Sequence, residues 1–157
     1  LSFTTLSGLL LSSIITLVSS KMSGLIYHKD QFERLFSYKF IKTFPLRDRD
    51  NWTQYIKSFQ KFIFAQTKDN KKLTFLKLAD TKSEILDSFI AQLKKDSNQN
   101  NLVIIDNLFD CEVQNDVVLL ATPGTVNNQQ IQLIIEEISM QNLNVIGWIY
   151  LDPNLNI

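Results

Sequence analysis

The sequence predicts an α/β fold in which a small, mainly parallel sheet with flanking helices is preceded by one transmembrane helix. The chain has 157 residues, about one domain. Its first 20 residues carry no charge, and beyond residue 72 short apolar runs alternate with stretches of helical periodicity. A single cysteine excludes an internal disulfide, and a single histidine argues against a zinc site built by this chain alone.

Residues 1–20 are the predicted membrane helix. A helix of about 20 residues covers roughly 30 Å, the hydrocarbon thickness of a bilayer. The Lys/Arg-rich stretch that follows predicts an inner (cytoplasmic) membrane protein with residues 21–157 in the cytoplasm. A signal-peptide core and a buried helix of a soluble protein are the alternatives, although no basic start or small-residue cleavage site is present. Because the chain starts at Leu1, we expect it to be a fragment.

The net charge of zero conceals an asymmetry along the chain. Residues 21–72 hold 12 Lys/Arg against 5 Asp/Glu, whereas residues 73–157 hold 4 against 11. The basic stretch could bind anionic lipid head groups or be merely solvated. The acidic lobe argues against nucleic acid as a partner. The expected parts are a transmembrane helix (1–20), a basic juxtamembrane segment (21–50) and a cytoplasmic α/β domain (51–157).

The pattern of apolar residues in the basic stretch predicts a helix and a strand. Residues 29–36 are expected to form a short amphipathic helix, and residues 38–44 a short strand. A longer helix begins at Asn51, where apolar side chains recur every three to four residues. These side chains are expected in the core rather than as a stacking platform for bases: Trp52, Tyr55, Ile56, Phe59, Phe62 and Ile63. Lys57, Lys61 and Lys68 lie largely off this stripe and predict a solvated face.

Beyond residue 72, four apolar runs are expected to be strands: residues 73–79, 102–105, 117–121 and 145–150. Continuous apolar strands alternating with helices are typical of a parallel sheet covered on both faces. In such sheets ligands bind at the carboxyl ends of the strands. Candidate site residues are therefore expected at 79–83, 106–110 and 121–124.

Motifs at both ends of the chain resemble one family. The stretch after the uncharged segment reads K-D-Q-F-E-R-L-F-S-Y-K-F-I-K-T-F-P. The residues that match the family's pattern are Asp30, Glu33, Leu35, Thr43 and Pro45, then Asp116, Leu120, Pro123 and Gly124, and finally Val145, Ile146, Gly147 and Ile149. On these residues, the chain resembles the second membrane helix and cytoplasmic part of bacterial polysaccharide chain-length determinants (polysaccharide co-polymerases) fused to a tyrosine-kinase-type domain.

The resemblance covers nearly the whole chain in order. It implies a P-loop NTPase-like fold and a role in surface polysaccharide biosynthesis, in exopolysaccharide, capsule or the O-antigen of lipopolysaccharide. It also implies rings of subunits beneath the membrane, with ATP near the subunit boundary. The implied partners are the membrane, other copies of the chain, and polysaccharide polymerase or export proteins.

The chain departs from this family at the P-loop, GxxxxGK[ST]. The matching stretch reads L-A-D-T-K-S at residues 78–83, and no glycine lies between residues 25 and 123. Glycines let a loop backbone approach phosphate closely, and Asp80 places a negative charge where phosphate should sit. Lys82 and Ser83 retain a Lys-Ser pair. They are the candidate nucleotide-binding residues of a degenerate P-loop, with an ordinary helix start as the favoured interpretation.

The chain also keeps little of the family's magnesium site and of its C-terminal phosphorylation site. Asp106, after strand 102–105, takes the position of the family's magnesium-associated aspartate, and a turn-forming role is the alternative. Tyr150 stands alone near the end of the chain, where the family has a tyrosine cluster. We therefore expect no catalytic residue and no cofactor, with ATP and magnesium disfavoured.

The sequence thus favours a non-catalytic, membrane-anchored component of polysaccharide chain-length control or export, with a degenerate kinase-like domain, a pseudokinase. Two alternatives from other classes remain open. One is an active ATP-dependent protein tyrosine kinase with an aberrant P-loop. The other is a membrane-anchored interaction domain of unrelated function.

Overall fold

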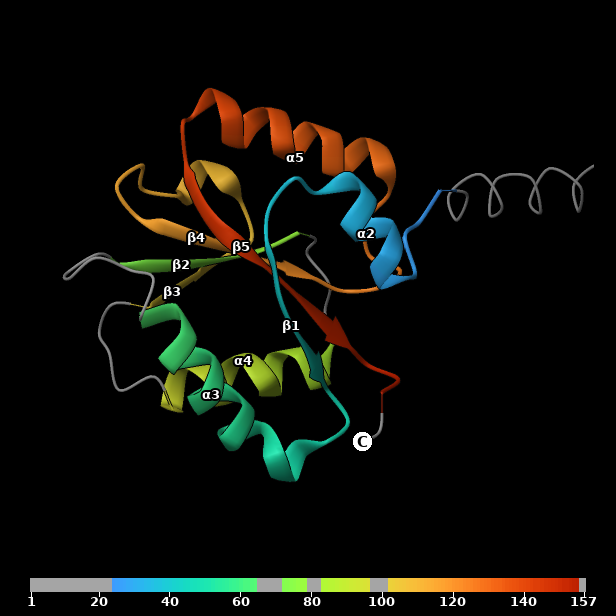
Figure 1. Ribbon diagram of the computed structural model, residues 1–157, viewed down its shortest axis with the longest axis vertical. Helices are drawn as coiled ribbons and strands as arrows, with labels where there is room; N and C mark the ends of the chain where they lie inside the picture. Colours follow the sequence, from blue (N-terminus) through green and yellow to red (C-terminus); the bar gives the residue numbers. More distant parts are fainter. Residues whose placement is uncertain (1–23, 65–71, 79–82, 97–101, 156–157) are drawn as a thin grey trace, which may run out of the picture.

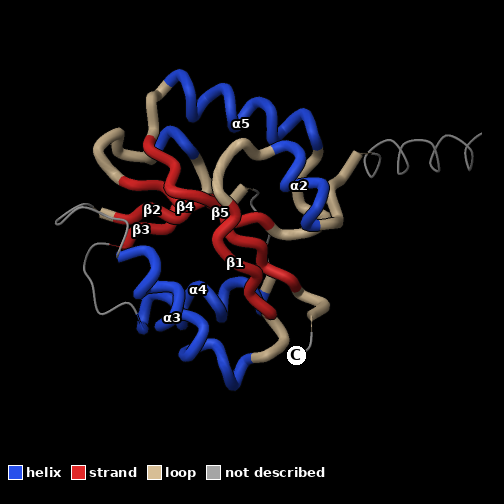
Figure 2. The backbone as a smooth tube through the Cα atoms, in the orientation of Figure 1, coloured by secondary structure: helices blue, strands red, loops and turns tan. Residues whose placement is uncertain are grey.

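The chain folds into a five-stranded, all-parallel sheet with helices on both faces (Figures 1 and 2). This computed structural model describes residues 24–64, 72–78, 83–96 and 102–155. The strands lie in the order β1-β5-β4-β2-β3. Their bounds are β1 Phe40–Pro45, β2 Leu73–Lys77, β3 Leu102–Ile105, β4 Asp116–Ala121 and β5 Asn144–Asp152.

Helices cover the two faces of the sheet in separate pairs, as Figure 1 shows. The upper face in that view carries α2 (Lys29–Leu35) and α5 (Asn128–Met140). The lower face carries α3 (Trp52–Phe64) and α4 (Glu84–Asp96). Two short 3-10 helices complete the fold: η1 (Arg49–Asn51) leads into α3, and η2 (Leu108–Asp110) lies in the connection from β3 to β4.

The expected parallel sheet is confirmed, and the structure adds a strand to it. The four strands expected beyond residue 72 are present, β3 with the expected bounds and the others with ends shifted by one or two residues, and the short strand expected at 38–44 is β1. This strand pairs in parallel with β5 and forms one edge of the same sheet. Residue 50, where the sequence placed a domain boundary, lies in η1 between β1 and α3.

Each face of the sheet has its own buried core. The upper core includes Phe32, Trp148 and Tyr150, and the Phe32 ring lies 6.1 Å from Trp148 and 5.9 Å from Tyr150, between centroids. In the lower core the Phe89 ring lies 5.2 Å from Phe44 and 5.4 Å from Trp52. The apolar stripe of α3 packs in the core, as expected: Trp52, Ile56, Phe59 and Ile63 are buried, and Tyr55 and Phe62 are partly buried against them. Lys57 and Lys61 are exposed, and Lys68 lies outside the described residues.

Gly147 allows β1 to approach β5 closely. A Cβ at this position would collide with the backbone oxygen of Lys39 and would lie 2.8 Å from Cγ1 of Ile41. The pairing register shifts on both sides of this point, between Phe40 and Lys42 in β1 and opposite Val117/Val118 in β4. Glycine within a strand often marks such an irregularity or a close backbone approach.

Within the described part of the chain, no helix combines the length and apolar character that a membrane crossing requires. The predicted membrane helix at residues 1–20 lies outside the described residues.

Candidate functional site

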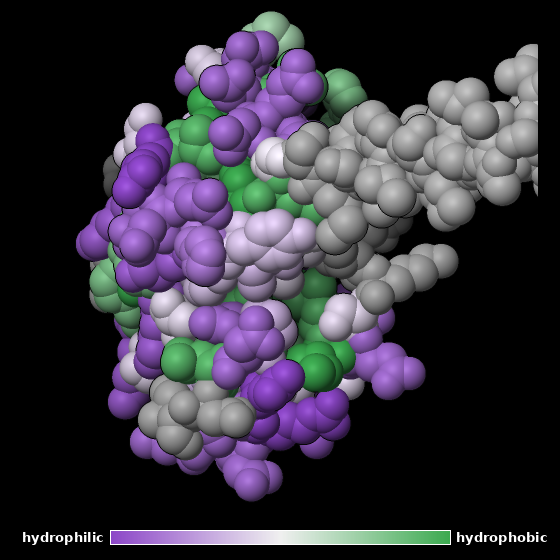
Figure 3. All heavy atoms as spheres, turned by 90° about the vertical axis from the view of Figure 1, so that its right-hand side faces the viewer, coloured by the Kyte–Doolittle hydropathy of each residue, from purple (hydrophilic) through white to green (hydrophobic). Residues whose placement is uncertain are grey.

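The carboxyl edge of the sheet is where a fold of this type would place a ligand. From β2 the chain continues to β3 on one side, and from β4 it continues to β5 on the other, so the order reverses between β2 and β4. Parallel sheets bind ligands at such a switch point. Figure 3 looks onto this side of the molecule.

The candidate nucleotide-binding residues, Lys82 and Ser83, follow β2 in the sequence. Lys82 lies outside the described residues. Ser83 immediately precedes α4: its Oγ is 3.5 Å from the Leu86 amide nitrogen, and its carbonyl oxygen accepts a hydrogen bond from the Asp87 amide at 2.8 Å. Ser83 therefore occupies a helix-start position, which fits the favoured interpretation of this residue.

Asp106 directly follows β3 and forms an ion pair with Lys77, the last residue of β2. The Lys77 Nζ atom is 2.5 Å from Oδ1 of Asp106. The lysine side chain is 14% exposed and the aspartate side chain 53%. A divalent cation bound at Asp106 would be repelled by the adjacent ammonium group of Lys77, because both carry positive charge. Among the described residues, no group of three or more His, Cys, Asp or Glu side chains could hold a metal ion.

Two hollows meet at this ion pair, one on each side of the sheet. The first, of about 260 Å³, lies under η2 and α5 and is lined partly by Leu76, Leu78 and Phe109. The second, of about 320 Å³, lies against α4, where Asp87, Ile90 and Lys94 contribute to its lining. Lys77 and Asp106 line both.

The loop after β4 is covered by the chain's own N-terminal residues. The Ile26 amide donates to the Val126 carbonyl at 2.9 Å, and the Gly124 amide donates to the Ile26 carbonyl at 2.7 Å. Gly124 has a φ of +71°, and a Cβ there would lie 2.9 Å from Cε1 of Tyr27. Glycine is therefore required by both the backbone conformation and the Tyr27 ring.

At the start of α5, two amide groups are engaged by side chains of the same turn. The Asn127 side chain accepts a hydrogen bond from the Gln130 amide at 2.8 Å. The Gln130 side chain in turn accepts one from the Asn127 amide at 2.9 Å. This reciprocal capping box engages amide groups that would otherwise be available to a phosphate.

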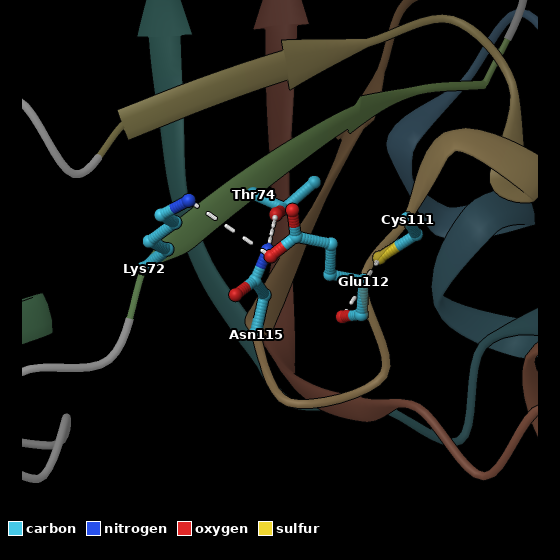
Figure 4. Close-up of polar contacts among 5 residues, drawn as sticks. All are labelled: Lys72, Thr74, Cys111, Glu112 and Asn115. Carbon is cyan, nitrogen blue, oxygen red and sulfur yellow. Dashed lines mark hydrogen bonds and ion pairs between the residues drawn. The ribbon is translucent and has the colours of Figure 1, made fainter.

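The amino edge carries a different, buried polar cluster (Figure 4). The Asn115 side chain donates to the Thr74 hydroxyl at 3.3 Å, and both residues are buried. Asp116, also buried, accepts a hydrogen bond from the Asn144 side chain at 2.6 Å. These bonds tie the starts of β2, β4 and β5 together, so we assign them to the fold rather than to a site.

Two further groups have raised pKa values. Burial raises the pKa of the Cys111 thiol, the charge of Glu112 adds to the effect, and a hydrogen bond with Thr74 opposes it. Burial, followed by the charge of Asp152, raises the pKa of Tyr150 to about 12. The Tyr150 hydroxyl donates to the Tyr27 carbonyl at 3.0 Å, which fixes the N-terminal segment to the sheet. Both groups are therefore protonated at neutral pH.

Sequence reasoning identified the carboxyl edge but missed Lys77 and Tyr27. A signal for Lys77 was present, because a charged residue ends the apolar strand 73–77 and Asp106 ends the next, and parallel neighbours bring such ends together. Tyr27 gave no signal, since its position depends on how the first described residues fold back onto the loop after β4.

The fold is a parallel α/β domain, and at its carboxyl edge several of the described groups contact other groups of the same chain. Comparison of the chain with protein-family models, with curated proteins and with solved structures finds no match.

Proposed function

We propose that this chain is a non-catalytic, membrane-anchored component of surface polysaccharide biosynthesis, acting in chain-length control or export as a docking module. One observation carries the non-catalytic part of this proposal: groups at the carboxyl edge contact other groups of the same chain. Lys77 is paired with Asp106, Tyr27 covers Gly124, and Asn127 caps α5. A phosphate would have to displace these contacts.

The polysaccharide part of the proposal rests on the resemblance in sequence. The order of an uncharged segment, a basic segment and an α/β lobe supports it, as do the matching residues from Asp30 to Ile149. The corresponding partners are the membrane, further copies of the chain, and polymerase or export proteins. In this proposal the lobe lies in the cytoplasm, next to the inner membrane.

Calorimetry with magnesium-ATP tests the non-catalytic role. The full chain, kept in detergent, should give no binding heat at physiological nucleotide concentration. A micromolar dissociation constant that is lost in Lys82→Ala would instead establish the alternative, an active kinase with an aberrant P-loop. The Lys95→Ala variant is the matched control, because it removes an exposed lysine at the far end of α4.

Disruption of the gene in the source organism tests the polysaccharide role. The length distribution of the surface polysaccharide on gels should change, and complementation should restore it. An unchanged distribution would favour the alternative of an unrelated membrane-anchored interaction domain. A reporter fused after Ile157 tests the orientation, which requires reporter activity on the cytoplasmic side.

A further inference from the structure

The surface around η2 and α5 leaves large apolar side chains exposed. Phe109 of η2 is 76% exposed and Leu133 of α5 is 64% exposed, and both line the 260 Å³ hollow under these helices. Met140, seven residues beyond Leu133 and so on the same side of α5, is 75% exposed. Scattered apolar residues are ordinary on a surface, but a clustered set beside a hollow marks an interaction site.

We name this feature the η2–α5 groove. Its apolar lining is formed by Leu76, Leu78, Leu108, Phe109, Leu133 and Ile134. Lys77, Asp106, Asn107 and Glu137 supply the polar part of the lining. Near the top of Figure 3, hydrophobic and hydrophilic residues are interspersed over this layer of the molecule.

Among the described residues around the groove, carboxylates outnumber cationic groups. Residues 102–155 contain no lysine or arginine at all. Of the lining residues that the structure describes, Lys77 alone is cationic, and it is paired with Asp106. Glu137 in the lining, Glu136 beside it and Asp110 of η2 add carboxylates. The groove therefore presents an apolar floor with a negative rim.

We infer that the η2–α5 groove docks a basic amphipathic helix of a partner protein. Helices bind to grooves through apolar anchors at i, i+3, i+4 and i+7, and Lys or Arg on the flanks would complement the negative rim. Such complementarity speeds association and selects the partner. The hollow of about 260 Å³ falls below the roughly 300–1,000 Å³ of sites that enclose a drug-sized ligand, which argues against an enclosed small molecule here.

Two other occupants fit the groove less well. Anionic lipid head groups would meet the carboxylates of its rim and be repelled. A second copy of this chain offers a cationic surface at η1 and α3, but the hollow there is lined by polar side chains, among them Asn51, Gln54 and Lys57. That surface has no large exposed apolar side chain among those described, so it lacks an anchor for the groove.

The probe for this site is a synthetic amphipathic helix with leucine at i, i+3, i+4 and i+7 and lysine elsewhere. Its fluorescently labelled form is titrated with the full chain and anisotropy is measured. Leu133→Ser should weaken binding about tenfold or more, since it removes one buried apolar contact. Val113→Ser is the matched control, because Val113 is also exposed, at 61%, and does not line the groove.

Both substitutions replace exposed side chains, so both proteins should fold, which circular dichroism verifies. Detergent competes for the peptide to the same extent in both titrations, so the ratio of the two dissociation constants does not depend on it. Glu137→Gln should weaken binding and reduce its dependence on salt.

Three results would overturn the inference. One is equal affinity of the Leu133→Ser and Val113→Ser proteins. Another is equal binding of a scrambled peptide of the same composition. The third is binding of unlabelled full chain to labelled full chain with the same dependence on Leu133, which would assign the groove to a second copy. None of these results bears on nucleotide binding, so the proposed non-catalytic role is tested separately.

Discussion

On the lower face of the sheet, α3 and α4 place their apolar side chains in the core and their charged ones in solvent. On the upper face, η2 and α5 leave Phe109, Leu133 and Met140 in solvent beside carboxylates. Described side chains of α3 and α4 include no large apolar group exposed to this degree. Both faces bury aromatic residues, so the difference lies in what each layer presents outward. This difference between the two layers is the observation on which the inferred docking site on the upper layer rests.

The largest expected effect tests whether the two cores are equally well packed. Phe89→Ala in the lower core and Phe32→Ala in the upper core each remove a fully buried ring. Each should lower the free energy of unfolding by about 3–5 kcal/mol, as measured by urea denaturation. Phe109→Ala, at an exposed site, should change it by less than about 0.5 kcal/mol. A loss at Phe109 as large as at Phe89 would remove the distinction between surface and core on the upper face.

The next effect concerns the edge strand that borders both cores. Gly147→Ala should lower the free energy of unfolding by about 1–3 kcal/mol. The added methyl group must displace the backbone of Lys39, just before β1, and the side chain of Ile41 within it. Thermal unfolding measures this loss, and hydrogen exchange should show faster exchange of β1 amides. Ser139→Ala, at an exposed site on α5, provides a control with an unchanged midpoint. Equal midpoints for both variants would mean that β1 adjusts without loss.

A smaller effect is expected at the hydrogen bond that joins Tyr150 of the upper core to the segment of Tyr27. Tyr150→Phe removes the hydrogen bond to the Tyr27 carbonyl and should cost about 1 kcal/mol. The pKa of Tyr150 is raised to about 12 in the folded protein, so the unfolded chain ionises first as the pH rises. Stability from this group is complete below about pH 10, the ordinary pKa of tyrosine, and falls as the pH rises towards 12.

The measurement is the urea midpoint between pH 9 and pH 12 for both proteins. Tyr150→Phe should show a shallower decline than the unmodified chain. The remaining decline should come in part from Tyr38, whose pKa burial also raises. Identical slopes would mean that Tyr150 does not titrate differently in the folded and unfolded states.

The smallest effect lies at the ion pair where hollows on the two sides of the sheet meet. Lys77→Met and Asp106→Asn should each change the free energy of unfolding by about 0–1 kcal/mol, because the aspartate is half exposed and solvent screens the pair. A double-mutant cycle measures the coupling, which should decrease as salt is added. Coupling above about 2 kcal/mol would indicate a pair far less hydrated than its exposure implies.

The strands and the lower core could be predicted from sequence because their signals are local. Leu102 to Ile105 is an uninterrupted apolar run, and Trp52 to Ile63 repeats with the helical period, so each segment specifies its own form. The strand order could not be derived, since pairing β1 with β5 joins residues about a hundred positions apart and depends on the space that Gly147 leaves.

The candidate site was predicted in part for the same reason. Asp106 was found by its place after a strand, but its partner Lys77 required the register of β2 on β3. Leu133 belongs to α5, in which Ile131 and Ile138 are buried. Periodicity alone did not single out Leu133, which is exposed beside η2. The packing of η2 against α5 creates that groove, and no local pattern encodes it.

The attachment of Ile26 and Tyr27 to the loop after β4 has a mechanical consequence. Backbone bonds at Ile26 and the Tyr150 hydroxyl on Tyr27 fasten the chain to the body of the protein within four residues of Gly24. The loop held in this way ends at Asn127, which caps α5. A displacement of Ile26 or Tyr27 would therefore disturb the loop that leads into the first turn of the helix that carries Leu133.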